Sequence, residues 1–129
     1  MGTAKWDARL LGAFGFGKNV VGTETTIGSG KRNIDYIIAT LGGNGKAAQV
    51  CREYTRNGYR DWFLPSQDEL DLMYKNLHQR RLGNFSTVSY HWSSSQLNDE
   101  SAYCQHFSNG GRSHAEKNVE YYVRPVRMF

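Results

Sequence analysis

Cysteine, proline and long hydrophobic runs are scarce in this chain, and each scarcity excludes a class of protein. Two cysteines, Cys51 and Cys104, are too few for a disulfide framework, and their spacing matches no zinc pattern. The sequence leaves open whether they pair. No apolar run approaches the roughly 18 residues of a membrane-spanning helix, and Met1–Leu11 lacks a signal-peptide core. We therefore expect a domain without a membrane span. Any export signal would lie outside this chain or work by another route, so the cell compartment stays open, the cell surface included.

What the chain has instead is glycine and aromatic residues. Fourteen glycines stand beside three tryptophans, eight tyrosines and six phenylalanines, with only two prolines. This composition is typical of a folded, turn-rich chain and not of a disordered one. At 129 residues the chain has the length of one domain, and we expect a single domain over 1–129.

The net charge of +4 suggests a polyanion partner until its location is considered. Residues 1–86 hold twelve Lys/Arg against eight Asp/Glu, whereas residues 87–129 hold four of each. Lys31-Arg32 and Arg80-Arg81 are the densest basic pairs, and such pairs are typical of solvated helix ends. We therefore expect no nucleic-acid partner.

Apolar spacing predicts helices in the first two thirds of the chain and strands in the last third. The helices are expected at about 31–40, from an Asn44 cap to Asn57-Gly58, and from Ser66 to about Gly83. An early strand with loops is expected within 1–28, and later strands near 88–94, 102–107 and 120–127. This order of elements predicts an α+β fold.

The start of the third helix carries the sharpest local signal. Ser66 and Glu69 have capping-box spacing, so each side chain can accept a hydrogen bond from the backbone N–H of the other. Asp68 and Asp71 beside them complement the helix dipole. We expect this acidic turn to be exposed, which argues against paired carboxylates that exchange protons with a substrate.

The apparent catalytic motifs are incomplete. Gly12–Lys18 has the spacing of a phosphate-binding loop, but Asn19 stands where the magnesium-binding hydroxyl is required. The hydroxyls of Ser93–Ser95 have no evident base, and we expect them to bond backbone groups at a strand end. The four histidines lack metal-ligand spacing: His78, His91, His106 and His114. We expect no enzyme, no metal and no cofactor.

Three long motifs, Gly58–Leu70, Tyr90–Ser95 and Tyr122–Phe129, together resemble the DUF1566 family. Thr26–Lys31 and Leu41–Gly43 extend the resemblance to about residues 22–129. It implies a C-type-lectin-like fold, in which two helices pack on a small twisted antiparallel sheet. It also implies a ligand face built from the late strands and loops.

Within that fold, region 89–129 resembles the variable proteins of diversity-generating retroelements, which randomise adenine-containing codons near the chain end. Anchors such as Trp92, Phe107, Tyr122 and Val126 alternate with polar stretches that show no hydrophobic pattern, at 96–101 and 111–120. The resemblance implies a diversified surface for a protein or glycan ligand. The residues that match the variable class are His91, Leu97, Asn98, Tyr103, Cys104, His106, Arg112, Ser113, His114, Glu116, Val119 and Glu120.

Other activities of lectin-like proteins lack their motifs in this chain. There is no Glu-Pro-Asn-like calcium motif, and Cys51 and Cys104 lie in unsuitable segments for a formylglycine-generating enzyme. Two alternatives stay open. A surface adhesin that binds sulfated polysaccharide or glycan through basic scaffold residues would lose its ligand in modest salt. A structural module would bury its late loops against a partner subunit.

Overall fold

The computed structural model describes residues 2–3, 11–15, 18–55, 58–76 and 90–127 and has an α+β fold. Its helical elements are α1 (Gly30–Leu41), the short 3-10 helix η1 (Gly42–Asn44), α2 (Lys46–Glu53) and α3 (Gln67–Asn76). Its strands are β1 (Gly2–Thr3), β2 (Leu11–Ala13), β3 (Tyr90–Gln96), β4 (Ser101–His106), β5 (Arg112–Glu116), β6 (Glu120–Tyr122) and β7 (Val126–Arg127). The predicted order of helices first and strands last is confirmed.

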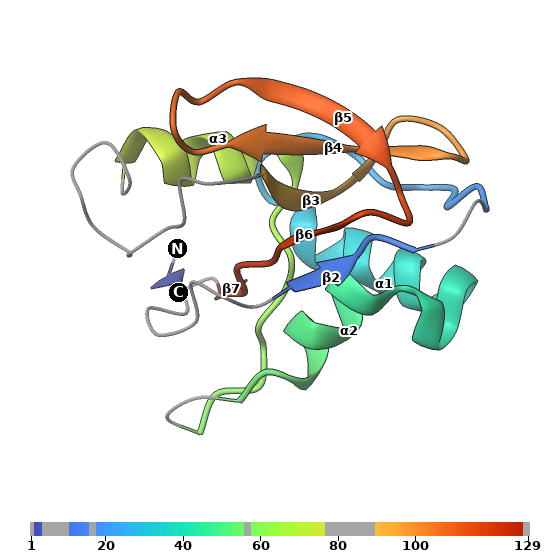
Figure 1. Cartoon of the computed structure of the whole chain (residues 1–129). Helices are drawn as coiled ribbons and strands as arrows, with labels where there is room; N and C mark the ends of the chain where they lie inside the picture. Colours follow the sequence, from blue (N-terminus) through green and yellow to red (C-terminus); the bar gives the residue numbers. More distant parts are fainter. Residues whose placement is uncertain (1, 4–10, 16–17, 56–57, 77–89, 128–129) are drawn as a thin grey trace.

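Five of the strands form one twisted sheet in the order β2-β6-β3-β4-β5 (Figure 1). The neighbours are antiparallel except β3 and β6, which pair in parallel at His91 and Tyr122. The expectation of a purely antiparallel sheet is therefore wrong at one ladder, because β6 returns to the sheet beside β3 and not beside β5. A second sheet joins β1 to β7, and Phe63 bridges to Val126 beside it.

Helices α1 and α2 lie together against the β2–β6–β3 side of the sheet, whereas α3 lies apart beside β3 and β4 (Figure 1). The apolar stripe predicted for the first helix is confirmed, since Ile34, Ile37 and Leu41 are buried. Trp92 is fully buried, and its ring packs edge-on to Phe14 with the ring centroids 5.9 Å apart. The predicted anchor Tyr122 is only half-buried.

The predicted Asn44 cap is wrong by one residue. Asn44 lies in η1, and Gly45 is the residue that precedes α2. A Cβ on Gly45 would lie 2.9 Å from Cγ2 of Ile37, so a side chain at this position would push the two helices apart.

Strand β5 is not predicted by the sequence, which places a stretch without hydrophobic pattern at 111–120. Its residues alternate between exposed and half-buried, and none of them is fully buried. An edge strand with polar side chains on both faces gives no apolar alternation to detect. The pairing with β4 makes it a strand.

Both cysteines are buried and free, which settles the pairing that the sequence left open. Burial raises the pKa of Cys51 well above its usual range, and burial raises the pKa of Cys104 to about 12. Thiols in this state are poor nucleophiles. Within the described ranges, no helix is both long and apolar enough to cross a bilayer.

Candidate functional site: the outer face of strands β4 and β5

The register of β4 and β5 sorts their side chains onto two faces. Residues directly opposite each other in an antiparallel pair project to the same side, and residues two apart along a strand share that side. Tyr103 pairs with His114, and both side chains are on the side away from buried Ala102 and Cys104. We call this side the outer face; its members are Ser101, Tyr103, Gln105, Arg112, His114 and Glu116.

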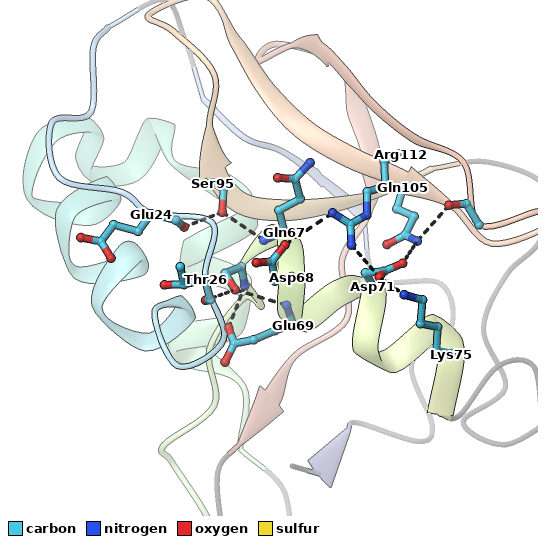
Figure 2. A network of polar contacts seen from close by, with 12 residues as sticks. Glu24, Thr26, Gln67, Asp68, Glu69, Asp71, Lys75, Ser95, Gln105 and Arg112 are labelled. Atoms are coloured by element: carbon cyan, nitrogen blue, oxygen red, sulfur yellow. Dashed lines mark hydrogen bonds and ion pairs between the residues drawn. The ribbon is translucent and has the colours of Figure 1, made fainter.

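One end of the outer face is tied to α3 by a polar network (Figure 2). Gln105 donates from Nε2 to the Asp71 carboxylate at 2.9 Å and to the Gly110 carbonyl at 3.0 Å. Arg112 donates to the other Asp71 oxygen at 2.6 Å, and Lys75 pairs with that oxygen at 2.9 Å. We call this the anchored end, because α3 fixes the side chains of both strands there.

The Asp71 carboxylate is held ionised by this network. Burial by itself raises the pKa of Asp71, but the hydrogen bonds from Arg112, Lys75 and Gln105 outweigh it and lower the pKa to about 2. The same contact raises the pKa of Arg112. The predicted exposure of this acidic turn is wrong for Asp71, which is 8% exposed, and for Glu69, which is 1% exposed.

Glu69 confirms the predicted capping box and does more than cap α3. It accepts the backbone N–H of Ser66 at 2.8 Å, while the Ser66 hydroxyl accepts the N–H of Glu69 at 3.3 Å. It also accepts the N–H groups of Gly30 at 3.0 Å and Gly28 at 3.2 Å. One buried carboxylate therefore joins the start of α3 to the loop before α1. A Cβ on Gly30 would lie 2.3 Å from this carboxylate.

The hydroxyls of Ser93 and Ser95 bond backbone groups as the sequence predicts, whereas that of Ser94 accepts a hydrogen bond from the Asn33 side-chain amide at 3.1 Å. Ser93 donates to the carbonyl of Tyr103 at 2.7 Å, and Ser95 donates to the carbonyl of Glu24 at 2.7 Å. Ser95 also accepts the N–H of Gln67 at 3.0 Å (Figure 2). These buried hydroxyls tie β3 to its surroundings and present no nucleophile.

The middle of the outer face differs from the anchored end. His114 and Glu116 are exposed and Tyr103 is half-buried. Within the described part of the chain, their side chains make no hydrogen bond, ion pair or ring contact. We call these three positions the open middle. Their side chains meet solvent from a rigid strand pair and hold no other part of the fold.

The β3–β4 turn extends this open surface at one end. Leu97 is 41% exposed, an unusual state for a large aliphatic residue. Asn98 has a structural role, since its side-chain oxygen accepts the N–H groups of Glu100 at 3.0 Å and Ser101 at 2.8 Å. The turn lies beside the end of β5, because Ser101 pairs with Glu116.

Lys117 is one of the four basic residues in region 87–129, and it is buried. Its ammonium donates to the Lys18 carbonyl at 2.9 Å and to Oε1 of Gln96 at 2.7 Å. Desolvation lowers its pKa to about 8. No sequence signal marked this lysine, because burial of a lysine depends on the side chains packed around it.

Two of the twelve predicted positions are buried in the fold and do not face a ligand. His91 is 1% exposed, with its ring 4.5 Å from Phe107 and 5.5 Å from Tyr122. Cys104 is 2% exposed and lies on the side opposite the outer face. Their burial has two different causes. Cys104 points to the inner side of β4, whereas His91 pairs with Gln105 on the side of the outer face, where its ring contacts Phe107 and Tyr122.

The other predicted positions divide by place. His106 and Ser113 are half-buried on the side away from the outer face; the His106 ring contacts Tyr90, with centroids 4.9 Å apart, and its Nδ1 is 2.7 Å from the Ser108 hydroxyl. Val119 and Glu120 follow β5, where the Val119 carbonyl accepts the Trp92 indole N–H at 3.0 Å. The structure therefore unites Tyr103, Arg112, His114 and Glu116 on one face, with Leu97 and Asn98 at its end.

Two further expectations concern a metal site and the two pairs of adjacent basic residues. Among the residues that the structure describes, no three His, Cys, Asp or Glu side chains gather where they could hold a metal ion. Lys31 and Arg32 are exposed on α1. His78 and Arg80-Arg81 lie outside the described residues.

The sequence model of the Lcl C-terminal domain family matches residues 6–127 of the chain. The chain belongs to this family. The match spans α1 to α3 and the whole five-stranded sheet, so the outer face is part of the Lcl C-terminal domain itself. Among curated proteins, nothing matches the chain.

Proposed function

We propose that this Lcl C-terminal domain is a ligand-binding protein that displays exchangeable side chains on a fixed scaffold. The observation that carries the proposal is the open middle: Tyr103, His114 and Glu116 project from a paired strand couple and stabilise nothing else among the described residues. Recognition surfaces favour a rigid scaffold with adaptable aromatic and polar side chains. Leu97 and Glu120, both exposed, extend the set.

The finer identity that we propose is a DUF1566 domain of C-type-lectin-like fold, of the variable class found with diversity-generating retroelements. This identity is supported by the Trp92–Ser95 and Val123–Arg127 motifs, whose residues are almost all buried, on either side of stretches with many exposed residues. The ligand would be a protein or a glycan. No step of the proposal requires catalysis, a metal or a cofactor.

The structure narrows the exchangeable set that the resemblance implies. Asn98 caps the β3–β4 turn and Arg112 pairs with Asp71, so replacing either removes a contact of the fold. His91 and Cys104 are buried. Exchange at the open middle, with Leu97 and Glu120, is therefore the form of diversification that the fold accepts best.

The experiment is a display library in which Tyr103, His114, Glu116, Leu97 and Glu120 are randomised together, and which is selected on several unrelated proteins and glycans. We expect folded binders with distinct specificities. A matched library at His91, Asn98, Cys104, Arg112 and Ser113 should yield mostly unfolded clones. The proposal fails if the first library yields no binders or loses the fold as often as the second.

An adhesin that binds sulfated polysaccharide through scaffold cations is less well supported. Much of the basic charge on the described surface is already neutralised: Arg52 pairs with Asp35, Lys75 and Arg112 with Asp71, and Arg127 with Asp61. Five basic residues of the described ranges stay exposed without an ion pair: Lys18, Lys31, Arg32, Lys46 and Arg60. Heparin retention that disappears at about 0.15 M salt and falls in a Lys31→Ala/Arg32→Ala variant would favour the adhesin instead.

A further inference from the structure

Strand β5 is the last strand of the five-stranded sheet, so one of its backbone edges has no strand partner among the described residues. An exposed edge presents N–H and C=O groups that a further strand can bind. The identity of that strand is the question, and the sequence of β5 supplies an answer.

The hydrogen bonds to β4 determine which backbone groups of β5 point outward. Lys117 N–H donates to the Glu100 carbonyl and His106 N–H to the Gly111 carbonyl. Hydrogen-bonded pairs alternate along an antiparallel ladder, so Ser113 and Ala115 also bond to β4. The N–H and C=O groups of Arg112, His114 and Glu116 therefore face outward from the edge. Two of these carbonyls already accept a hydrogen bond within the chain, that of Glu116 from the Val119 N–H at 3.1 Å and that of His114 from the Ser113 hydroxyl at 3.4 Å. Each carbonyl oxygen has a second lone pair for a further donor.

These three residues are self-complementary. If a second β5 lies antiparallel beside the first with His114 opposite His114, then Arg112 lies opposite Glu116 of the second copy, and Glu116 opposite its Arg112. All three outward residues then form hydrogen-bonded pairs, and both charged pairs are of opposite sign. Opposite charges directly across a strand pair stabilise it, whereas like charges destabilise it.

At the anchored end, Asp71 already positions Arg112, which is the basic member of each charged pair. Asp71 holds the Arg112 guanidinium at 2.6 Å, while 42% of the Arg112 side chain stays exposed. A guanidinium has five N–H donors, so donors remain for a second carboxylate. Glu116, exposed and without an ion pair among the described residues, is that carboxylate.

We propose that two copies of this chain pair through their β5 edges about a twofold axis at His114, which joins two five-stranded sheets into one. The partner is thus a second copy of this chain. The strands are short, so the contact is smaller than a standard interface, and we expect a reversible dimer with a Kd on the order of 100 µM. This inference goes beyond the proposed function, because it concerns a contact between two copies of the chain. The contact shares His114 and Glu116 with the open middle.

Sedimentation of the full chain between about 10 µM and about 1 mM tests the pairing. Glu116→Arg places like charges opposite each other, and His114→Pro removes the central outward N–H without touching the bonds to β4. We expect each to weaken the dimer about tenfold or more. His114→Ala keeps the backbone donor and should retain most of the association. A chain that stays monomeric to about 1 mM, or a dimer indifferent to both variants, would overturn the proposal.

A cysteine scan gives a second readout that does not depend on affinity. In a hydrogen-bonded antiparallel pair the Cα atoms lie about 5.5 Å apart, within disulfide range. His114→Cys should therefore crosslink to its own copy under mild oxidation. In Glu116→Cys the two thiols would be offset by about 13 Å along the strands, so this variant is the matched control. Equal crosslinking of both variants would contradict the twofold at His114, and folding is verified by circular dichroism.

Discussion

The anchored end and the open middle of the outer face lie on the same pair of strands, but their side chains have different roles. At the anchored end, Gln105 and Arg112 reach Asp71 and hold α3 against the sheet. In the open middle, the neighbouring pair Tyr103 and His114 holds nothing else among the described residues. Strand pairing alone therefore does not decide what a side chain is for. The presence or absence of a helix above it does, because α3 covers only one end of the face.

The largest effect on the free energy of unfolding should come from Glu69, which holds the start of α3, the helix of the anchored end. Glu69→Ala leaves the buried backbone donors of Ser66 and Gly30, and the partly buried donor of Gly28, without their acceptor. We expect a loss of about 3–5 kcal/mol in the free energy of unfolding. Urea unfolding followed by circular dichroism measures it, with Glu116→Ala in the open middle as control, expected within about 0.5 kcal/mol. Equal losses in both variants would remove the distinction between the two halves.

A smaller effect is expected at Asp71, and it depends on pH. Its pKa lies at about 2, below the usual 3.8, so the native state binds fewer protons than the unfolded state between these values. The stability that this carboxylate provides is present above about pH 4 and lost as pH falls toward about 2, roughly 2 kcal/mol in all.

Thermal unfolding of wild type and Asp71→Asn from pH 5 to pH 2 measures this contribution. Wild type should lose stability more steeply than Asp71→Asn below about pH 4. Asp99→Asn, which removes an exposed carboxylate of the β3–β4 turn, should follow wild type. Parallel curves for wild type and Asp71→Asn would mean that the anchored end stores no ionic stabilisation.

The open middle should accept simultaneous change at little cost. In the triple variant Tyr103→Ser/His114→Ser/Glu116→Ser we expect a fall below about 1.5 kcal/mol, because isolated surface substitutions cost within about 0.5 kcal/mol each. The melting temperature and the amide spectrum of the variant are the measurements. Collapse of the fold would show that these side chains support the sheet and are not free for recognition.

The smallest effect on stability is expected for a test of thiol reactivity, which compares the two buried cysteines with a cysteine placed on the exposed face. Cys51 and Cys104 are buried, with raised pKa values, so a thiol reagent at pH 8 should modify them only after unfolding. A cysteine introduced by Glu116→Cys should react within seconds at almost no cost in stability. Rapid reaction of Cys104 in the native wild-type protein would contradict its placement on the inner side of β4.

The parts of the fold that the sequence predicts are those with local causes. The capping box of Ser66 and Glu69 and the apolar stripe of Ile34 and Ile37 depend on residues three or four apart, and both are confirmed. The bonding of the Ser93 and Ser95 hydroxyls to backbone carbonyls follows from the strand position. Strand β5 was missed because its side chains carry no apolar alternation, so only its pairing with β4 defines it.

The sequence predicts the candidate site as a group of twelve positions, and the structure divides these positions by their burial and contacts. The resemblance selected twelve positions in residues 91–120, but it gave no burial, so it grouped His91 and Cys104 with exposed residues. It also gave no contacts, so it did not separate Arg112, which α3 fixes, from His114, which nothing among the described residues fixes. Burial and contact depend on register and on the helices above the sheet.

By itself, the sequence determined the α+β class, the helix start at Ser66 and the region in which the site lies, because these follow from spacing and composition along the chain. Only the tertiary structure decided that β6 pairs in parallel with β3, that Lys117 is buried and that β5 ends the sheet. Each of these depends on groups brought together from distant parts of the chain. The division between the anchored end and the open middle also depends on the tertiary structure, because α3 covers only one end of the outer face.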